Sequence, residues 1–336
     1  MKDGAAAEIK PYRPTFRQRI SNFKIEISIL LVFVVIFLVY LIGNTKVFTS
    51  FDIYYAFMST MPFVGVLALA LTFVVTLGEI DLSFPSVIAI SAWVLSMVLL
   101  TTGSVIIAVL ASIAVGILAG LLNSLLIVGF GIPSIVATIG TQFFFRGLVN
   151  VLAAGNGISL ISAKAAPDAW VYQIFVGRIG GVIPAQFVWF VGLAAILWFI
   201  FYRHRFGSHV SFTGDNLSSS IMMGINVKRV KLTVYVIMGI FASLSGILSN
   251  FEVTYFYPSQ GDGLMMPALA AVFIGGTSVF GGKGTIVGSF VGALIIGSLE
   301  AGIVAIGING FWIKLIYGLI IMISVSIYSF ILKKAK

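Results

Sequence analysis

The chain of 336 residues is 60% hydrophobic and only 9% charged, and its mean hydropathy is +1.13. Soluble domains hold roughly 45–50% apolar and about 25% charged residues, so this composition excludes a water-soluble globular protein. The net charge of +9 lies in basic clusters beside apolar runs, a pattern that is typical of membrane topology signals and argues against nucleic-acid binding.

Apolar stretches of about 20 residues, the length that crosses a bilayer, follow one another along the chain. The first comes directly after a basic cluster, and we interpret it as a retained span that begins in the cytoplasm. The predicted spans are 25–43, 60–78, 84–102, 104–130, 132–154, 184–202, 231–251, 264–281, 284–308 and 311–332. The sequence therefore predicts an all-α polytopic membrane protein of about ten transmembrane helices.

Basic residues divide unevenly between the two sides of this predicted bundle. About fifteen fall on one side, whereas the loops on the other side hold only Lys46, Lys164 and Arg178. Because basic residues favour the cytoplasm, both termini are predicted to be cytoplasmic. The resulting division is a basic segment at 1–24, a transmembrane domain over 25–332 with a cytoplasmic loop at 203–230, and a basic tail at 333–336.

Two apolar segments start alike and break in corresponding places. Ala68–Phe73 reads Ala-Leu-Ala-Leu-Thr-Phe before a break at Gly78, and Ala268–Phe273 reads Ala-Leu-Ala-Ala-Val-Phe before a break at Gly275. Broken helices in matching halves often mark a transport pathway. An internal repeat with broken helices and a chance match of six positions both stay open.

Acidic residues follow the first break. Glu79 and Asp81 are flanked by long apolar runs, where ionisable groups are costly and usually functional. Glu79 is interpreted equally as pathway lining or as part of a turn, whereas for Asp81, with Ser83 and Pro85 after it, a helix cap is favoured. The candidate pathway or gating residues are Glu79, Asp81, Ser83, Gly275, Gly276 and Thr277.

No pattern predicts catalysis, a cofactor or a metal ion. The segment before Lys283 resembles a phosphate loop, but Thr277 and Gly284 stand where that motif needs Gly and Ser or Thr. The chain has no cysteine, and its histidines, His204 and His209, share one polar loop. We therefore expect a chain that is not an enzyme and that draws energy from a partner or an ion gradient.

The loop 203–230 contains a short amphipathic pattern. Leu217 and Ile221 recur at a four-residue spacing with Ile225, and Thr213 or Asp215 can cap a helix that carries them. Such a helix either lies on the membrane surface or docks into the groove of a partner protein. The pattern alone leaves both interpretations open.

Further charged residues lie within or near the predicted spans. Arg146 is expected to extend to the membrane interface, with pairing inside the bundle as the less favoured alternative. Glu252, Asp262 and Glu300 lie near outer span ends and are expected to be solvated loop acids, or else contacts for a soluble partner. The aromatic-rich loop 155–183 predicts a helix at the membrane interface.

Four segments, in chain order, resemble permeases of ATP-binding-cassette (ABC) importers for ribose, xylose and related simple sugars. Gly78–Ser83 is similar to the family signature Gly-Ile-Asp-Leu-Ser, and Pro267–Ser278 is the closest match. The other two segments are 133–147, which includes Arg146-Gly147, and 224–246.

The resemblance implies a permease subunit through which a monosaccharide, or a related polyol or nucleoside, is imported across the bacterial inner membrane. It also implies a second permease (an identical or a related chain), cytoplasmic ATPase subunits that hydrolyse ATP, and an extracytoplasmic sugar-binding protein. The ATPase-coupling residues would be Asp215, Leu217, Ile221, Gly224 and Ile225. The alternative function is an ion-coupled secondary transporter of a small polar solute, which shares the broken helices.

Overall fold

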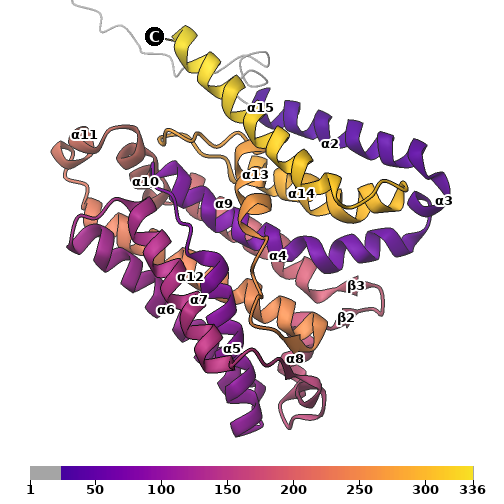
Figure 1. Ribbon diagram of the computed structural model, residues 1–336. Helices are drawn as coiled ribbons and strands as arrows, with labels where there is room; N and C mark the ends of the chain where they lie inside the picture. The colour runs from indigo at the N-terminus through magenta and orange to yellow at the C-terminus, as the bar shows by residue number, and fades with distance from the viewer. Residues whose placement is uncertain (1–23, 336) are drawn as a thin grey trace, which may run out of the picture.

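The computed structural model describes residues 24–335, and these residues form a bundle of helices (Figure 1). The long helices are α2 (Lys24–Gly43), α4 (Phe51–Thr76), α5 (Phe84–Thr102), α6 (Val105–Ser124), α7 (Ser134–Ala153), α9 (Ala185–Arg203), α12 (Val227–Val253), α14 (Ile286–Ala305) and α15 (Trp312–Ala335). The shorter elements are α3 (Thr45–Phe48), α8 (Ala169–Val176), α10 (Arg205–Asp215), α11 (Leu217–Met222), α13 (Met265–Ile274), the π-helix η1 (Leu125–Gly129), the 3-10 helix η2 (Ile161–Ala165), β1 (Ile158–Ser159), β2 (Arg178–Ile179), β3 (Ile183–Pro184) and β4 (Tyr255–Phe256).

The prediction of an all-α polytopic membrane protein is confirmed. Within residues 24–335, seven helices are long and apolar enough to cross a membrane, one of them formed by α6 and η1 together. Shorter apolar helices lie at Ile29–Gly43, Met265–Ile274 and Trp312–Ile323. Each of the ten predicted spans therefore overlaps one of these helices. Apart from Lys24, the basic segment 1–24 lies outside the described residues, whereas Lys333 and Lys334 of the predicted tail continue α15.

The predicted span 264–281 is wrong in its length. Its helix, α13, has ten residues, and a helix of that length rises about 15 Å, half of the hydrocarbon thickness of about 30 Å. The chain then continues without regular structure to Thr285. The sequence overestimated this span because the glycines after Ile274 do not interrupt its apolar character.

Glycines allow several of these helices to pack backbone against backbone. A Cβ at Gly116 of α6 would overlap the carbonyl of Gly239 in α12, and a Cβ at Gly288 of α14 would overlap the carbonyl of Gly275. Close contact of this kind is the usual packing of membrane helices. Of the seven long apolar helices, α4 is the most enclosed, with 83% of its most apolar stretch buried, whereas α7 and α9 reach 28%.

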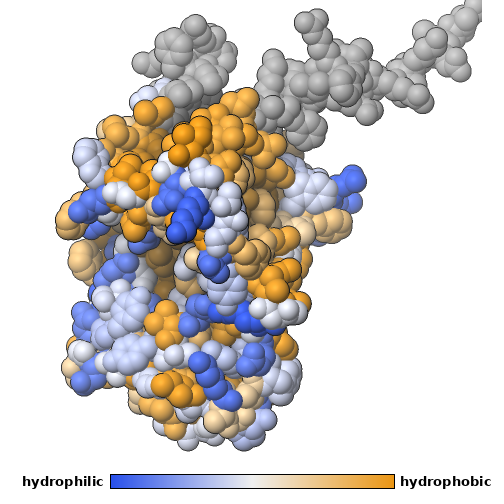
Figure 2. Space-filling view, turned by 90° about the vertical axis from the view of Figure 1, so that its right-hand side faces the viewer, coloured by the Kyte–Doolittle hydropathy of each residue, from blue (hydrophilic) through white to orange (hydrophobic). Residues whose placement is uncertain are grey.

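The bundle has two distinct ends. We call the end that carries α10 and α11 the α11 side, and the end that carries α3, α8, β2 and β3 the α8 side (Figure 1). The strands pair as β1 with β4 and as β2 with β3. Figure 2 shows hydrophobic residues over the upper part of one face, where α2, α14 and α15 lie, and more hydrophilic residues in its centre and below.

Asp168, on the α8 side, caps a helix that lies far from it in the sequence. Its carboxylate accepts hydrogen bonds from the N–H groups of Val105 and Ile106 at 2.9 and 2.8 Å and from the Ser104 hydroxyl at 2.6 Å. Burial alone would raise the pKa of Asp168, but these bonds outweigh it and lower the pKa to about 2. A helix in loop 155–183 was predicted, and it follows directly as α8, with Trp170 exposed. Its place at the membrane interface stays a prediction.

Candidate functional site: two helix breaks and an exposed elbow

Both predicted helix breaks begin with the same kind of helix end. The first break covers residues 77–83 between α4 and α5, and the second covers 275–285 between α13 and α14. Gly78 at φ +78° and Gly276 at φ +80° follow the respective last turns. In each case the glycine N–H bonds to the carbonyl three residues back, and the next N–H bonds five residues back. This is a Schellman motif, so the two segments are similar in backbone geometry as well as in sequence.

The first break passes through the protein interior. Asp81 and Ser83 are only 2% and 0% exposed. One oxygen of Asp81 accepts hydrogen bonds from the N–H and the hydroxyl of Ser83, both at 2.7 Å. Asp81 therefore orders the start of α5, where Pro85 occupies the first turn. The Ser83 side chain makes no capping bond to the helix, because its hydroxyl donates to Asp81.

A chain of buried hydrogen bonds continues from this break into two neighbouring helices. Asn123 of α6 donates from its side-chain amide to the Ser83 hydroxyl at 2.7 Å. Thr141 of α7 donates to the Asn123 side-chain carbonyl at 2.6 Å. Sequence reasoning missed Asn123 and Thr141, although an amide side chain within an apolar span is a signal for interhelical hydrogen bonding.

Glu79 forms an ion pair with Lys231, near the start of α12. Their side chains are 13% and 21% exposed, so the pair is largely enclosed. The neighbouring N–H of Ile80 donates to the Ser134 hydroxyl at the start of α7, at 3.3 Å. Glu79 therefore connects the first break to α12, a contact that neither of its sequence interpretations included.

The second break is held by its own backbone and by α4. Thr277, which is 2% exposed, accepts a hydrogen bond on its hydroxyl from the N–H of Thr285 at 3.3 Å. Beside the break, the hydroxyls of Thr72 in α4 and Ser289 in α14 share a bond of 2.7 Å. Gly275 packs against the backbone of Ser289. The predicted pathway residues are thus enclosed within the protein, and their role in transport stays a prediction.

A glycine junction joins both breaks to α10. We define it as Thr76, Gly214, Gly281, Gly282 and Gly284. The N–H of Gly282 donates to the carbonyl of Thr76 at 2.8 Å. A Cβ at Gly214 would overlap that same carbonyl, and one at Gly284 would overlap the Thr76 hydroxyl. With no side chain between them, the end of α4, the end of α10 and the second break are in direct backbone contact.

The elbow formed by α10 and α11 projects from this junction. Asn216 caps α11, accepting from the N–H of Ser219 at 2.9 Å, so the predicted caps at Thr213 and Asp215 are wrong. Asp215 instead is the last residue of α10. Asn216 takes the cap position of α11 because its backbone between the two helices is extended, and its short side chain can then reach the N–H groups of the first turn.

Apolar side chains cover the exposed face of the elbow. Leu217 and Ile221 are 48% and 60% exposed, and Met222 and Met223 are 87% and 57% exposed. Ile225, predicted on the same face, lies beyond the end of α11, because Gly224 takes a positive φ of +77° and turns the chain. The described structure therefore leaves an apolar face of α11 open to a neighbour.

Arg146 pairs inside the bundle, and the favoured prediction that it extends to the interface is wrong. Its guanidinium donates to the carbonyls of Pro258, Gln260 and Pro85 at 2.6, 3.1 and 3.2 Å and pairs with Asp262 at 2.6 Å. The acceptors belong to loop 257–264 and to the first turn of α5. The sequence could not place them, because they lie 61 to 116 residues from Arg146.

Of the other outer acids, Glu252 is also paired. It accepts hydrogen bonds from Arg178 at 2.7 Å and from the Gln186 amide at 2.9 Å, which overturns its assignment as a solvated acid. Glu300 is exposed, but it lies within α14, five residues before the end of that helix, and not in a loop. Among residues 24–335, no group of three or more His, Cys, Asp or Glu side chains could hold a metal ion.

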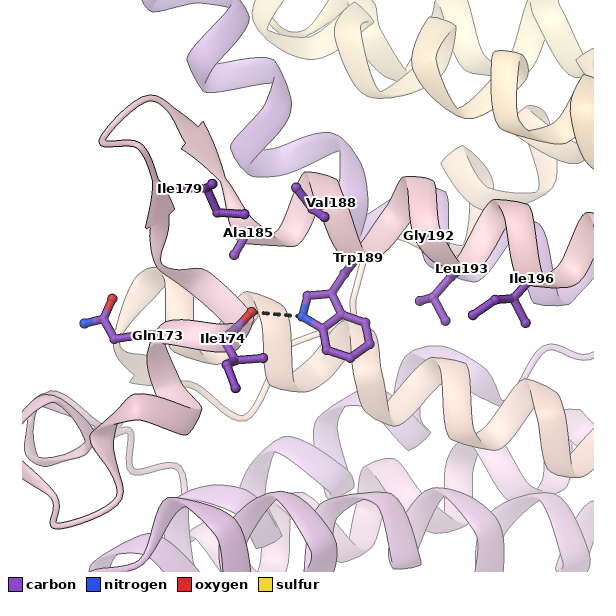
Figure 3. A pocket seen from close by; sticks show the side chains of 9 residues that line it. All are labelled: Gln173, Ile174, Ile179, Ala185, Val188, Trp189, Gly192, Leu193 and Ile196. Carbon is purple, nitrogen blue, oxygen red and sulfur yellow. Dashed lines mark hydrogen bonds between the residues drawn. The ribbon is translucent and has the colours of Figure 1, made fainter.

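A hollow of about 570 Å³ lies apart from the breaks, between α8 and α9 (Figure 3). Trp189 extends from α9 towards α8 and donates from its indole to the carbonyl of Ile174 at 2.9 Å. The remaining side chains are apolar except Gln173. A polar solute needs several hydrogen-bonding partners, so this hollow suits hydrocarbon better than sugar.

Comparison with known proteins decides what these breaks and the elbow belong to. A family model described as "Branched-chain amino acid transport system / permease component" matches residues 53–325. The chain belongs to this permease family. It is therefore a multi-pass membrane protein and the permease component of an importer, which confirms the resemblance found in the sequence.

Individual relatives within the family are similar over most of their length. The ribose import permease protein RbsC of Bacillus subtilis is 31% identical over 261 residues, covering 78% of this chain and 80% of the relative. The same-named protein of Escherichia coli (strain K12) is 30% identical over 263 residues, with the same coverage. The xylose/arabinose import permease protein XylH of Sulfolobus acidocaldarius is 29% identical over 324 residues, covering 93% and 86%. No solved structure matches the chain.

Proposed function

We propose that this permease forms the pathway for ATP-driven uptake of a simple sugar, with pentoses such as ribose and xylose as the first substrates to test. The names of its relatives support this substrate class. The chain itself performs no chemistry. It provides a gated passage, and ATP is hydrolysed by separate subunits.

The observation that carries the proposal is the elbow on the glycine junction. An ATPase subunit binds the apolar face of α11, whose Leu217 and Ile221 are half-exposed. A displacement of α11 passes through α10 to Gly214, which touches the end of α4 and the second break. Because the contact is backbone against backbone, little motion is lost in side-chain rearrangement. Both breaks therefore respond to one docking event.

The proposed arrangement in the membrane follows the basic residues. The α11 side is cytoplasmic, and both termini lie there, in the bacterial inner membrane. The α8 side faces out and receives a sugar-binding protein. A second permease, either identical or related, completes the pathway.

The test is reconstitution of the permease into liposomes with candidate ATPase subunits and the binding protein. We expect uptake of labelled D-ribose or D-xylose that requires ATP and is insensitive to ionophores. Uptake by the permease alone that collapses when an ionophore is added would overturn the proposal. Replacing ATP with a non-hydrolysable analogue is the matched control.

One observation favours the second candidate, an ion-coupled transporter. Asp81 is a fully enclosed carboxylate whose hydrogen bonds from side chains come from Ser83 and not from a cation. Carboxylates in such positions carry protons in many membrane transporters. Sugar uptake by the permease alone, driven by a pH gradient and abolished by Asp81→Asn, would identify this mechanism.

A further inference from the structure

The ion pair of Arg146 and Asp262 is unevenly covered. The side chain of Arg146 is 18% exposed, whereas that of Asp262 is 58% exposed. The arginine also donates to the carbonyls of Pro258, Gln260 and Pro85. These bonds fix the guanidinium in place, whereas the carboxylate of Asp262 stays open on one side.

By helix length, this pair lies between the two ends of the membrane-spanning helices that hold it. Arg146 comes 12 residues after Ser134 and seven before Ala153, so it lies about 18 Å and about 10 Å from the two ends of α7. Pro85, which it also contacts, is 17 residues from the far end of α5, or about 25 Å. Loop 257–264 therefore re-enters the bundle before the short helix α13 begins, and Figure 1 shows this part of the chain, in orange, near the middle of the molecule.

A half-exposed carboxylate at this depth requires water on its open side. Charged side chains facing lipid at mid-membrane are strongly disfavoured, and irregular backbone is found there only within protein or along a water-filled cavity. Glu252 and Arg178 form a useful contrast, because their side chains are 19% and 30% exposed and cover each other. The exposed residues of α9 between Val188 and Phe199 differ as well, because all of them are apolar or glycine, which suits contact with lipid.

We propose that Arg146 and Asp262 form a binding site for sugar hydroxyl groups on the wall of the aqueous pathway. The inference rests on the proposed function, and it adds a binding site to it. The free lone pairs of the Asp262 carboxylate accept hydrogen bonds from two neighbouring hydroxyls, and the guanidinium holds the carboxylate in position. The chemical class is a neutral polyhydroxylated solute. A carboxylate already paired with arginine attracts no cation strongly, so the sugar can also leave.

The first experiment measures water access and does not depend on what is transported. The native chain has no cysteine, so single cysteines can be introduced without removing others. Ser259→Cys lies exposed on the same loop, and Ala195→Cys lies exposed in the middle of α9. In membrane vesicles with the ATPase subunits bound, a charged, membrane-impermeant methanethiosulfonate should modify Ser259→Cys at least tenfold faster than Ala195→Cys. Equal, slow modification of both cysteines would overturn the proposal that loop 257–264 lines an aqueous pathway.

The second experiment asks whether sugar binds there. D-Ribose or D-xylose at millimolar concentration should slow the modification of Ser259→Cys. Asp262→Asn should raise the KM for uptake roughly tenfold or more, with a smaller change in maximum rate, because hydrogen bonds to a charged group are lost. Asp52→Asn, an exposed acid at the start of α4 that bonds to Ser50, is the matched control and should leave KM unchanged.

The outcomes separate this inference from the proposed function. ATP-driven uptake, together with modification of Ser259→Cys that sugar does not slow and an unchanged KM in Asp262→Asn, would overturn the sugar-binding site and leave the importer assignment intact. Rapid modification of Ser259→Cys that sugar slows, in a protein whose uptake needs no ATP, would support the sugar-binding site and overturn the importer mechanism.

Discussion

The backbone N–H of Gly282 donates a hydrogen bond to the carbonyl of Thr76 at 2.8 Å, and this contact joins the second helix break to the helix that precedes the first. Gly214 packs onto the same carbonyl from α10. Three segments distant in the sequence therefore meet at one carbonyl group. The position of the elbow relative to both breaks depends on this meeting point.

A side chain at Gly214 should disrupt the glycine junction. In Gly214→Val the new atoms overlap the Thr76 carbonyl, and overpacking of this kind costs about 1–3 kcal/mol. We expect a lower melting temperature in detergent and a loss of ATP-driven uptake. Gly192→Val in α9, where a Cβ would meet no atom within 4 Å, is the control. Normal uptake by Gly214→Val would show that the junction does not transmit motion.

Charges on the exposed face of α11 should uncouple ATP hydrolysis from uptake. In the variant Leu217→Asp/Ile221→Asp, the permease should still fold, because both side chains are exposed, but the ATPase subunits should no longer co-purify with it. Ser218→Asp, on the exposed polar side of the same helix, is the matched control and should bind them normally. Unchanged binding and uptake in the double variant would remove α11 as the docking site.

Removing one charge from the largely enclosed pair of Glu79 and Lys231 should destabilise the protein. Glu79→Gln leaves the ammonium of Lys231 without its partner and should cost about 1–3 kcal/mol in stability, with reduced uptake. If the pair serves only to connect the first break with α12, Glu79→Gln/Lys231→Met should recover most of that loss in thermal melting. Recovered stability without recovered uptake would instead indicate that Glu79 lines the pathway.

Asp168 should give a pH-dependent contribution to stability on the α8 side. Its pKa of about 2 in the folded protein is below the usual value of about 3.9. A depressed pKa means that the contribution is complete above pH of about 4 and is lost as the pH falls towards 2. Asp168→Asn should therefore melt lower than the native protein by a constant amount between pH of about 5 and 8, with the difference shrinking below pH of about 4.

Asp52→Asn provides the control for this pH profile, because Asp52 is an exposed acid at the start of α4 and bonds only locally, to Ser50. Its difference from the native protein should be small at every pH. A difference for Asp168→Asn that grows as the pH falls would contradict the capping role, since protonation can only weaken a carboxylate cap.

The spans themselves were predictable because hydropathy acts locally. A run of apolar residues is stable in lipid as a helix whatever its neighbours are, so 84–102 was predicted with the bounds that α5 has. The breaks were also predictable, since Gly78 and the glycines after Ile274 act on their own turns. Family membership followed from the same local segments.

What the sequence determined by itself was therefore the membrane location, the approximate spans, the two breaks and the permease family, all of which depend on neighbouring residues. Only the tertiary structure decided that Arg146 holds loop 257–264 and that Gly214 meets Thr76. These features depend on partners up to 138 residues away along the chain. Hydrogen bonds, ion pairs and backbone contacts act over a few ångströms, so their partners become known only once the helices are packed.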